Sequence, residues 1–158
     1  MKQDPEAEFV VLYNAAGTNL SAGVYDVSSR SRMFYAEHTV YASVTQTLPE
    51  AFYLVSVLNC STVNEIIKPF QSLGLLGERH IEKKVLELPI PQFDKTDKVY
   101  LRLAELGESA SKAVLSAIQS GTIAGTLGTR RRLARESAAA QLEEIDKLVK
   151  GLLSPHRD

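Results

Sequence analysis

The chain has 158 residues, of which 44% are hydrophobic and 23% charged, and its net charge is −1. This length predicts one ordinary domain with a buried core, and the near-neutral charge lacks the basic excess that is typical of nucleic-acid-binding domains. One cysteine excludes an internal disulfide, and the three histidines are too scattered for a metal site. Neither a signal peptide nor an apolar run long enough to span a membrane is visible, so we expect a cytoplasmic protein without a membrane partner.

The first part of the chain is predicted to form strands separated by turn-rich loops. Residues 9–13 are an apolar run typical of a strand, and the loop after it contains Asn14, Gly17 and Asn19. Residues 34–45 alternate between two sets of side chains, which predicts a second strand. The set predicted to form its apolar face is Phe34, Ala36, His38, Val40, Ala42 and Val44. His38 is therefore interpreted as a core histidine.

Two short helices are predicted between residues 49 and 70. The first should end near Asn59, because apolar residues recur at the spacing of one helix face, at Ala51, Leu54, Val55 and Leu58. For the second, Thr62 and Glu65 have the spacing of a capping box. Its apolar stripe would consist of Val63, Ile66, Ile67 and Phe70, before Pro69 disrupts the next turn.

The chain after this helix pair is predicted to run through a connector into a long helix. Pro89 and Pro91 exclude a central strand and favour an edge strand or an extended connector. A helix of about six turns is then predicted from Thr96 to about Gln119, because apolar residues follow the helical period. The segment SGTIAGTLG ends it.

A last helix, from about Thr129 to Leu153, carries an apolar seam with coiled-coil spacing. Its seam residues are Ala138, Leu142, Ile145, Val149 and Leu152. The seam is too short to be stable alone, so it needs the preceding helix folded back as a hairpin, or a second protein. A helix that covers its own core is the alternative. Together the elements predict an α+β fold with a small mixed or antiparallel sheet, two short packed helices and a C-terminal helical hairpin, divided into units 1–95 and 96–158.

Three segments carry a resemblance to a known family: YLVSVLNCSTVNEIIKPFQS (53–72), GERHIEKK (77–84) and ELPIPQFD (87–94). They are similar to the C-terminal part of the target-recognition domains of N6-adenine DNA methyltransferases and of specificity subunits of type I restriction-modification systems. In that family an "lLNS" helix turn, a glycine-basic segment and an "lPiP" extended piece lead into a long helix. The likeness spans about residues 36–115, half of the chain, and Cys60 stands where serine is common.

The resemblance implies a DNA sequence-recognition module of a restriction-modification type methyltransferase system. The chain contains neither an Asp/Asn-Pro-Pro-aromatic tetrapeptide nor a glycine-rich cofactor loop, so we expect no catalytic activity of its own. Its expected partners are double-stranded DNA and a methyltransferase subunit or domain, and the last helix is where it would form a homo-oligomer. The chain itself is expected to bind no cofactor, and S-adenosylmethionine would belong to the catalytic partner or to a missing portion.

Two loops and one arginine run are the candidate DNA-contacting segments. The candidates are Asn19 in the first loop, Gln71, Arg79, His80, Lys83 and Lys84 in the second, and Arg130 and Arg131. The cations would bind phosphates, and the amides would contact base edges. Each has a plainer explanation: a solvated turn for the basic cluster, turn chemistry for the amides, and an acidic protein partner for the arginines.

Two other classes of function stay open. A protein-interaction adaptor would act through the C-terminal helices and use the sheet only as a scaffold. An enzyme is disfavoured, because no acid–base or nucleophile constellation has recognisable spacing. Cys60 is interpreted as a small buried residue at a helix junction, since nothing in the local sequence supplies a base for it.

Overall fold

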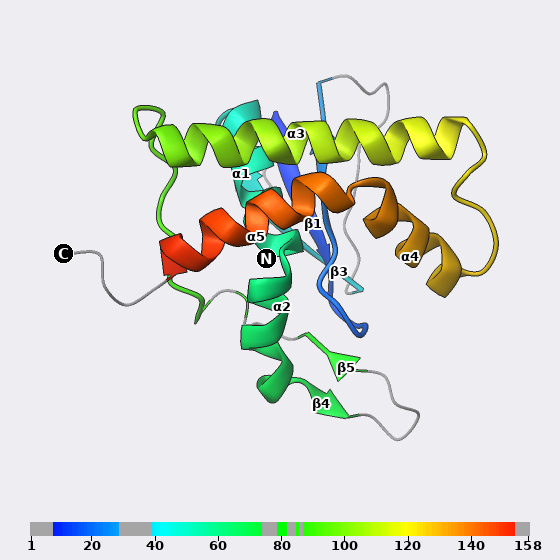
Figure 1. The fold of residues 1–158 in the computed structure, drawn as a ribbon. Helices are drawn as coiled ribbons and strands as arrows, with labels where there is room; N and C mark the ends of the chain where they lie inside the picture. Colours follow the sequence, from blue (N-terminus) through cyan, green and yellow to red (C-terminus); the bar gives the residue numbers. More distant parts are fainter. Residues whose placement is uncertain (1–7, 29–38, 74–78, 82–84, 86, 154–158) are drawn as a thin grey trace.

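A three-stranded antiparallel sheet forms one layer of the fold (Figure 1). In the computed structural model, which describes residues 8–28, 39–73, 79–81, 85 and 87–153, its strand order is β2-β1-β3. The strands are β1 (Phe9–Asn14), β2 (Ala22–Asp26) and β3 (Val40–Thr45). The sheet and the helices described below confirm the predicted α+β class.

The face of β3 that packs on the core is the opposite of the face predicted from the alternation of its side chains. Directly opposite residues share a face of an antiparallel sheet, and Tyr41 is opposite the buried Tyr13. Their rings stack at 5.2 Å, and Thr45 is buried on the same side. Val44, predicted on the apolar face, is 43% exposed, so that prediction is wrong for residues 40–45. The aromatic pair buries more surface than the small Ala42 would. Phe34, Ala36 and His38 lie outside the described residues.

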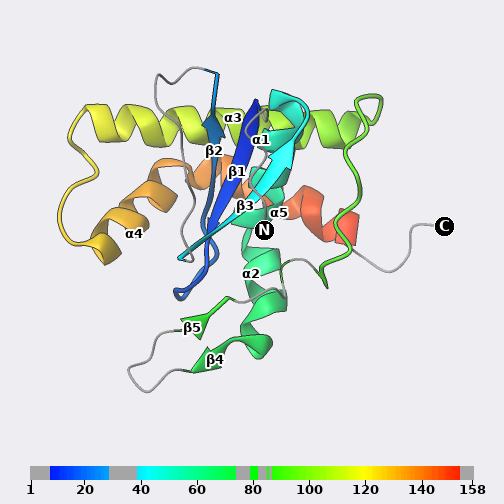
Figure 2. The ribbon, with the colours of Figure 1, turned by 180° about the vertical axis from the view of Figure 1, so that it is seen from behind.

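Helix α1 (Leu48–Asn59) is the centre of the core. It contacts all three strands on one side and α3 (Lys98–Gln119) on the other, so it is the middle of three layers (Figure 2). Thr47 accepts a hydrogen bond from the Glu50 amide at 3.3 Å, and Pro49 occupies the first turn, as expected of a helix start. The predicted helix is confirmed, but its burial is broader than one stripe: Ala51, Tyr53, Val55, Ser56, Val57 and Leu58 are all buried.

Helix α2 (Ser61–Ile67) begins at a different cap from the predicted one. The N-cap is Cys60, whose Sγ accepts from the Val63 amide at 3.3 Å. Thr62 instead donates from its amide (2.9 Å) and its hydroxyl (3.2 Å) to Asp146 of the last helix, α5 (Ala139–Leu153), so the predicted capping box is wrong. Of the predicted stripe, Val63 and Ile67 are buried, whereas Ile66 and Phe70 are exposed. Besides the Cys60 cap, a carboxylate from a distant helix therefore accepts the hydrogen bond of the Thr62 amide, which local spacing cannot reveal.

A short hairpin and a connector follow α2. The 3-10 helix η1 (Lys68–Phe70) leads into β4 (Ser72–Leu73), which pairs with β5 (Arg79–His80). Residues 87–97 contain no strand, so of the two forms predicted for the proline segment they adopt the extended connector. The Tyr53 hydroxyl holds it by donating to the Pro91 carbonyl at 2.9 Å.

The C-terminal part folds back on α3, which confirms the predicted helical hairpin. Helix α3 has Asp97 as its N-cap, and the chain then returns as α4 (Leu127–Ser137) and α5 (Ala139–Leu153). One continuous helix from 129 to 153 was predicted, but Ala138 breaks it at φ −112° and ψ 16°. No proline or glycine causes the break. Buried Ala138 is the point where the chain turns, so that both α4 and α5 can pack against α3.

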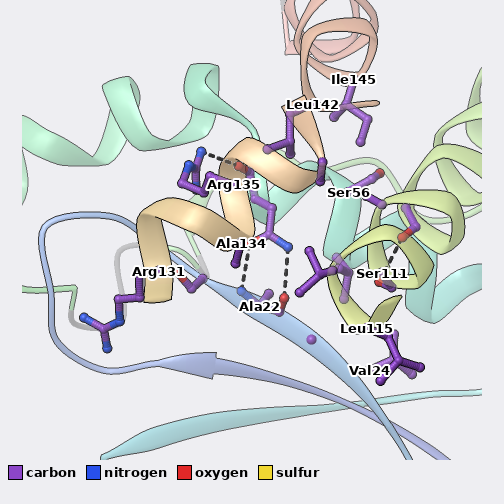
Figure 3. A pocket seen from close by; sticks show the side chains of 18 of the residues that line it. Ala22, Val24, Ser56, Ser111, Leu115, Arg131, Ala134, Arg135, Leu142 and Ile145 are labelled. Atoms are coloured by element: carbon purple, nitrogen blue, oxygen red, sulfur yellow. Dashed lines mark hydrogen bonds between the residues drawn. The ribbon is translucent and has the colours of Figure 1, made fainter. Parts of the chain in front are cut away.

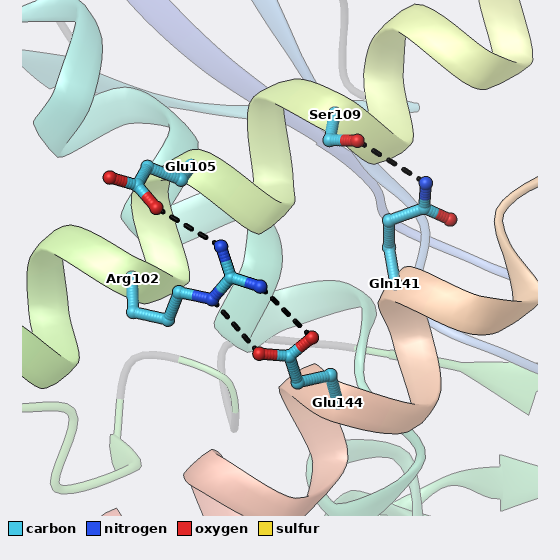
Figure 4. Close-up of polar contacts among 5 residues, drawn as sticks. All are labelled: Arg102, Glu105, Ser109, Gln141 and Glu144. Atoms are coloured by element: carbon cyan, nitrogen blue, oxygen red, sulfur yellow. Dashed lines mark hydrogen bonds and ion pairs between the residues drawn. The ribbon is translucent and has the colours of Figure 1, made fainter.

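The predicted seam on α5 packs within the chain itself. Ile145 and Val149 are fully buried, and the core cluster that contains them also contains residues of β1, α1 and α3. That single cluster therefore joins residues from both sides of position 95. On the surface, Arg102 of α3 donates to both carboxylate oxygens of Glu144 at 2.9 and 3.1 Å (Figure 4). This pair is half exposed, so burial of the seam contributes more to stability than the ion pair does.

None of the helices in the described part of the chain is both long and apolar enough to cross a membrane.

Candidate nucleic-acid interface

The loop between β1 and β2, residues 14–21, is held in one conformation by its own side chains. Asn14 donates from Nδ2 to the carbonyls of Ala16 (2.8 Å) and Asn19 (3.1 Å), and its Oδ1 accepts from the Ser21 amide at 2.7 Å. Gly17 has a φ of +139°, which side-chain-bearing residues rarely adopt. Because Asn14 uses both ends of its amide within the loop, it is a structural residue there.

Two further asparagines clamp the end of this loop to the helices. Asn64 of α2 accepts from the buried Leu20 amide at 2.7 Å and donates to the Cys60 carbonyl at 2.8 Å. Asn59, at the end of α1, accepts from the Ala22 amide at 2.8 Å and donates to the Ala22 carbonyl at 2.9 Å. The side-chain oxygen and nitrogen of both asparagines are thus hydrogen-bonded. The loop tip, with the exposed side chains of Thr18 and Asn19, is therefore anchored from behind.

The hairpin β4–β5 meets the same loop. The Ile81 amide donates to the Ala15 carbonyl at 2.9 Å, and the Ile81 side chain is buried. Arg79 and His80 directly precede Ile81, so their backbone lies beside the loop, as both ribbon views show (Figures 1 and 2). Lys83 and Lys84 lie outside the described residues. The first loop and the described part of the second, which the sequence analysis proposed as the DNA-facing segments, thus lie side by side at one end of the sheet.

Gln71, a predicted base-contacting residue, is turned inward. Both polar atoms of its amide are buried, and neither has a hydrogen-bond partner among the residues that the structure describes. In this conformation the side chain does not present itself to a ligand. Asn19, by contrast, is exposed at the loop tip, where a base-contacting side chain would need to be.

Helix α4 adds positive charge to this end of the molecule. A Cβ atom placed on Gly17 would lie 3.3 Å from Nη1 of Arg131, so this guanidinium covers the loop and points away from the neighbouring cavity (Figure 3). Arg130 and Arg131 are exposed and have no acidic partner within the described ranges. The two other arginines are engaged: Arg132 pairs with Glu136 at 2.6 Å, and Arg135 donates to the Asn59 carbonyl at 3.0 Å.

A cavity of about 380 Å³ lies behind these arginines, between β2 and helices α1, α3, α4 and α5 (Figure 3). Its walls are mainly apolar, and Leu115 and Ile118 at its α3 side are 53% and 49% exposed. The hydroxyls of Ser56 and Ser111 donate to backbone carbonyls at 2.7 and 2.9 Å. Its described lining contains no histidine, cysteine or carboxylate. These walls therefore supply none of the usual acid–base groups.

Cys60 lies in the core, as interpreted from the sequence. The pKa of its thiol is raised to about 12, chiefly by burial and also by the nearby Asp146, while hydrogen bonding with the Val63 and Thr62 amides lowers it. Since this pKa lies far above neutrality, the thiol stays protonated and is a poor nucleophile. Within the described ranges, no three His, Cys, Asp or Glu side chains lie close enough together to form a metal site.

Sequence reasoning missed three contributors to this surface: Asn59, Asn64 and Thr18. The asparagines carry a detectable signal, because each is a polar residue within or beside an apolar helical run, where a buried amide needs partners. Which partners they have depends on contacts with residues 20 and 22, far away in the chain. Comparison with protein-family models, with curated proteins and with solved structures found no match.

Proposed function

We propose that this chain is a DNA sequence-recognition module of a restriction-modification type DNA methyltransferase system. The observation that supports this most is the hydrogen bond from the Ile81 amide to the Ala15 carbonyl. It places the hairpin that contains Arg79 and His80 beside the loop that contains Asn19. A recognition surface needs this combination of phosphate-binding cations and polar groups that contact base edges.

The role of each part follows from its chemistry. Arg130 and Arg131, together with Arg79, Lys83 and Lys84, would bind phosphates and fix the position of the duplex. Asn19 and the loop tip would contact base edges. The loop is already ordered by its asparagines, so binding would not have to offset the entropy of ordering it.

The near-zero net charge is compatible with this surface, because the charges are unevenly distributed. In the described part of the C-terminal helices, five glutamates form ion pairs with cations of these helices: Glu105 and Glu144 with Arg102, Glu108 with Lys112, Glu136 with Arg132, and Glu143 with Lys147. Arg130 and Arg131 remain available at the loop end. Local rather than net charge decides whether a duplex is attracted there.

We expect the purified chain to transfer no methyl group to DNA in the presence of S-adenosylmethionine. The sequence contains none of the catalytic or cofactor-binding motifs of the family it resembles, and a catalytic partner would supply them. Incorporation of labelled methyl groups into duplex DNA measures this directly. Incorporation by the chain alone would overturn the proposal that it only recognises sequence.

Salt-dependent binding tests where the duplex lies. Each cation that binds a phosphate releases about one counterion, so the Arg130→Ala, Arg131→Ala double variant should flatten the slope of log K against log salt by about two units. The triple variant Arg79→Ala, Lys83→Ala, Lys84→Ala should flatten it by about three. Stability should hardly change with Arg130 and Arg131 replaced, since they are exposed.

Lys112→Ala is the matched control, because Lys112 is an exposed helical cation that pairs with Glu108 on α3. It should leave both affinity and slope as they are. Unchanged slopes for the double and the triple variants would show that neither segment contacts phosphates, and the proposed surface would be wrong.

A protein-interaction adaptor is the second candidate. The exposed Leu115 and Ile118 beside the cavity favour it, because large apolar side chains that gather at a hollow often mark a protein contact. Binding of duplex DNA that weakens with salt would support the first candidate and would not be expected of the second.

A further inference from the structure

We infer that Asn59 and Asn64 are positioning residues that set DNA sequence preference by fixing the conformation of the loop tip at Thr18 and Asn19. This inference rests on the proposed function and deepens it. It assigns a task to the asparagine of the "LNC" segment and to a second asparagine on α2 that the sequence analysis did not single out. It also adds Thr18 to the candidate base-contacting residues.

The geometry separates the tip from its supports. Thr18 and Asn19 expose their side chains, whereas the amide of Leu20, the next residue, is bonded to Asn64 at 2.7 Å in the interior. The Leu20 side chain is itself fully buried. The fixed point in the core therefore directly follows the solvent-facing tip in the chain.

The second fixed point is Ala22, whose amide and carbonyl both bond to the side chain of Asn59. Because the Asn59 side chain bonds both the donor and the acceptor of the Ala22 backbone, Ala22 cannot move along the strand without breaking a hydrogen bond. Together with the hydrogen bonds of Asn14 within the loop, the two asparagine clamps hold the backbone of the tip in one conformation. Discrimination between bases requires donors and acceptors at fixed positions, because a mobile side chain can adapt to more than one base edge.

The same network reaches the phosphate-binding candidates. Arg135 of α4 donates to the carbonyl of Asn59 at 3.0 Å, and α4 also carries Arg131, whose guanidinium covers Gly17. The clamp thus joins the base-contacting tip and the cationic helix to one residue at the end of α1. The bond from Arg135 is to the backbone carbonyl, so replacing the Asn59 side chain removes the link to the tip and leaves the link to the cationic helix.

The test uses the full chain and two readouts. A library of short duplexes of random sequence is first selected on the wild-type protein, and discrimination is the ratio of Kd for a scrambled duplex to Kd for the selected one. Asn64→Ala should lower this ratio by about tenfold or more, the size of one or two lost base contacts, with the salt slope unchanged. Amide exchange at Leu20 should become faster in the same variant, because its acceptor is gone.

Further variants keep the test decisive if Asn64→Ala does not fold. Asn59→Ala removes the other clamp, and Thr18→Ala with Asn19→Ala removes only exposed tip groups. Each should lower discrimination and preserve the salt slope. Glu65→Ala, an exposed change on α2, is the control and should alter neither readout.

The outcomes separate the inference from the function on which it rests. If the wild-type chain binds no duplex, or binds all duplexes equally, the proposed recognition function is wrong. If it selects a sequence but the clamp and tip variants keep the wild-type ratio, the recognition surface lies elsewhere and the inference alone is overturned. If the clamp variants lose both the salt slope and the Kd ratio, the inference is also overturned. The asparagines would then support the whole DNA-binding surface and not the base-contacting tip in particular.

Discussion

Replacing Gly107 with alanine should destabilise the fold by more than about 3 kcal/mol, at the upper end of the cost of overpacking. Gly107 lies where α3 crosses α1. A Cβ atom there would lie inside van der Waals contact with the Phe52 carbonyl oxygen and 3.1 Å from its carbonyl carbon. These are backbone atoms of the central helix, so the clash cannot be relieved by a side-chain rotation. The two helices would have to separate.

Gly151→Ala is the matched control, because Gly151 is also helical but a Cβ there would meet nothing within 4 Å. This change should stabilise by about 0.5 to 1 kcal/mol through helix propensity. Thermal unfolding measures both, with an expected fall of roughly 10 °C for Gly107→Ala. Equal and small effects of the two substitutions would show that α1 and α3 do not pack this closely.

Replacing Ile145 with aspartate should cost about 4 kcal/mol or more, because it removes a large apolar side chain and buries a charge. Ile145 has no exposed surface, and α5 packs against α1, α2 and α3 of the same chain. The loss should therefore appear as a lower melting temperature of the single chain.

Ala140→Asp places the same charge at an exposed position in the first turn of α5, where a carboxylate suits the helix dipole. It should leave stability nearly unchanged. Melting curves measure the stability of both variants, and the mass in solution shows whether each remains a single chain. An Ile145→Asp protein that melts like the wild type would contradict the packing of the seam.

The sequence predicted those parts of the fold that depend on local periodicity. The helical spacing of apolar residues located α1 and α3, and the length of the α5 seam required a partner helix, which α3 provides. Predictions failed where a distant residue decided the outcome. Tyr13 sets the inward face of β3, and Asp146 takes the bonds that a local capping box would have made at Thr62.

The candidate site was predictable in composition but not in arrangement. The basic and amide residues were visible in the sequence, whereas the contact between residues 15 and 81 and the two asparagine clamps are non-local. Gln71 shows that the type of a residue alone does not identify a base-contacting position. Its amide suits base contacts, yet both polar atoms of this amide are buried.

The most direct test of the proposed function is the equilibrium binding of the wild-type chain to short duplex DNA at increasing salt, followed by fluorescence anisotropy. Binding at about 50 mM salt should weaken as salt rises, with a log–log slope of about −4 to −5, since Arg130, Arg131, Arg79, Lys83 and Lys84 would each neutralise about one phosphate. Absence of binding at low salt, or an affinity that does not depend on salt, would contradict the proposal that this surface binds DNA.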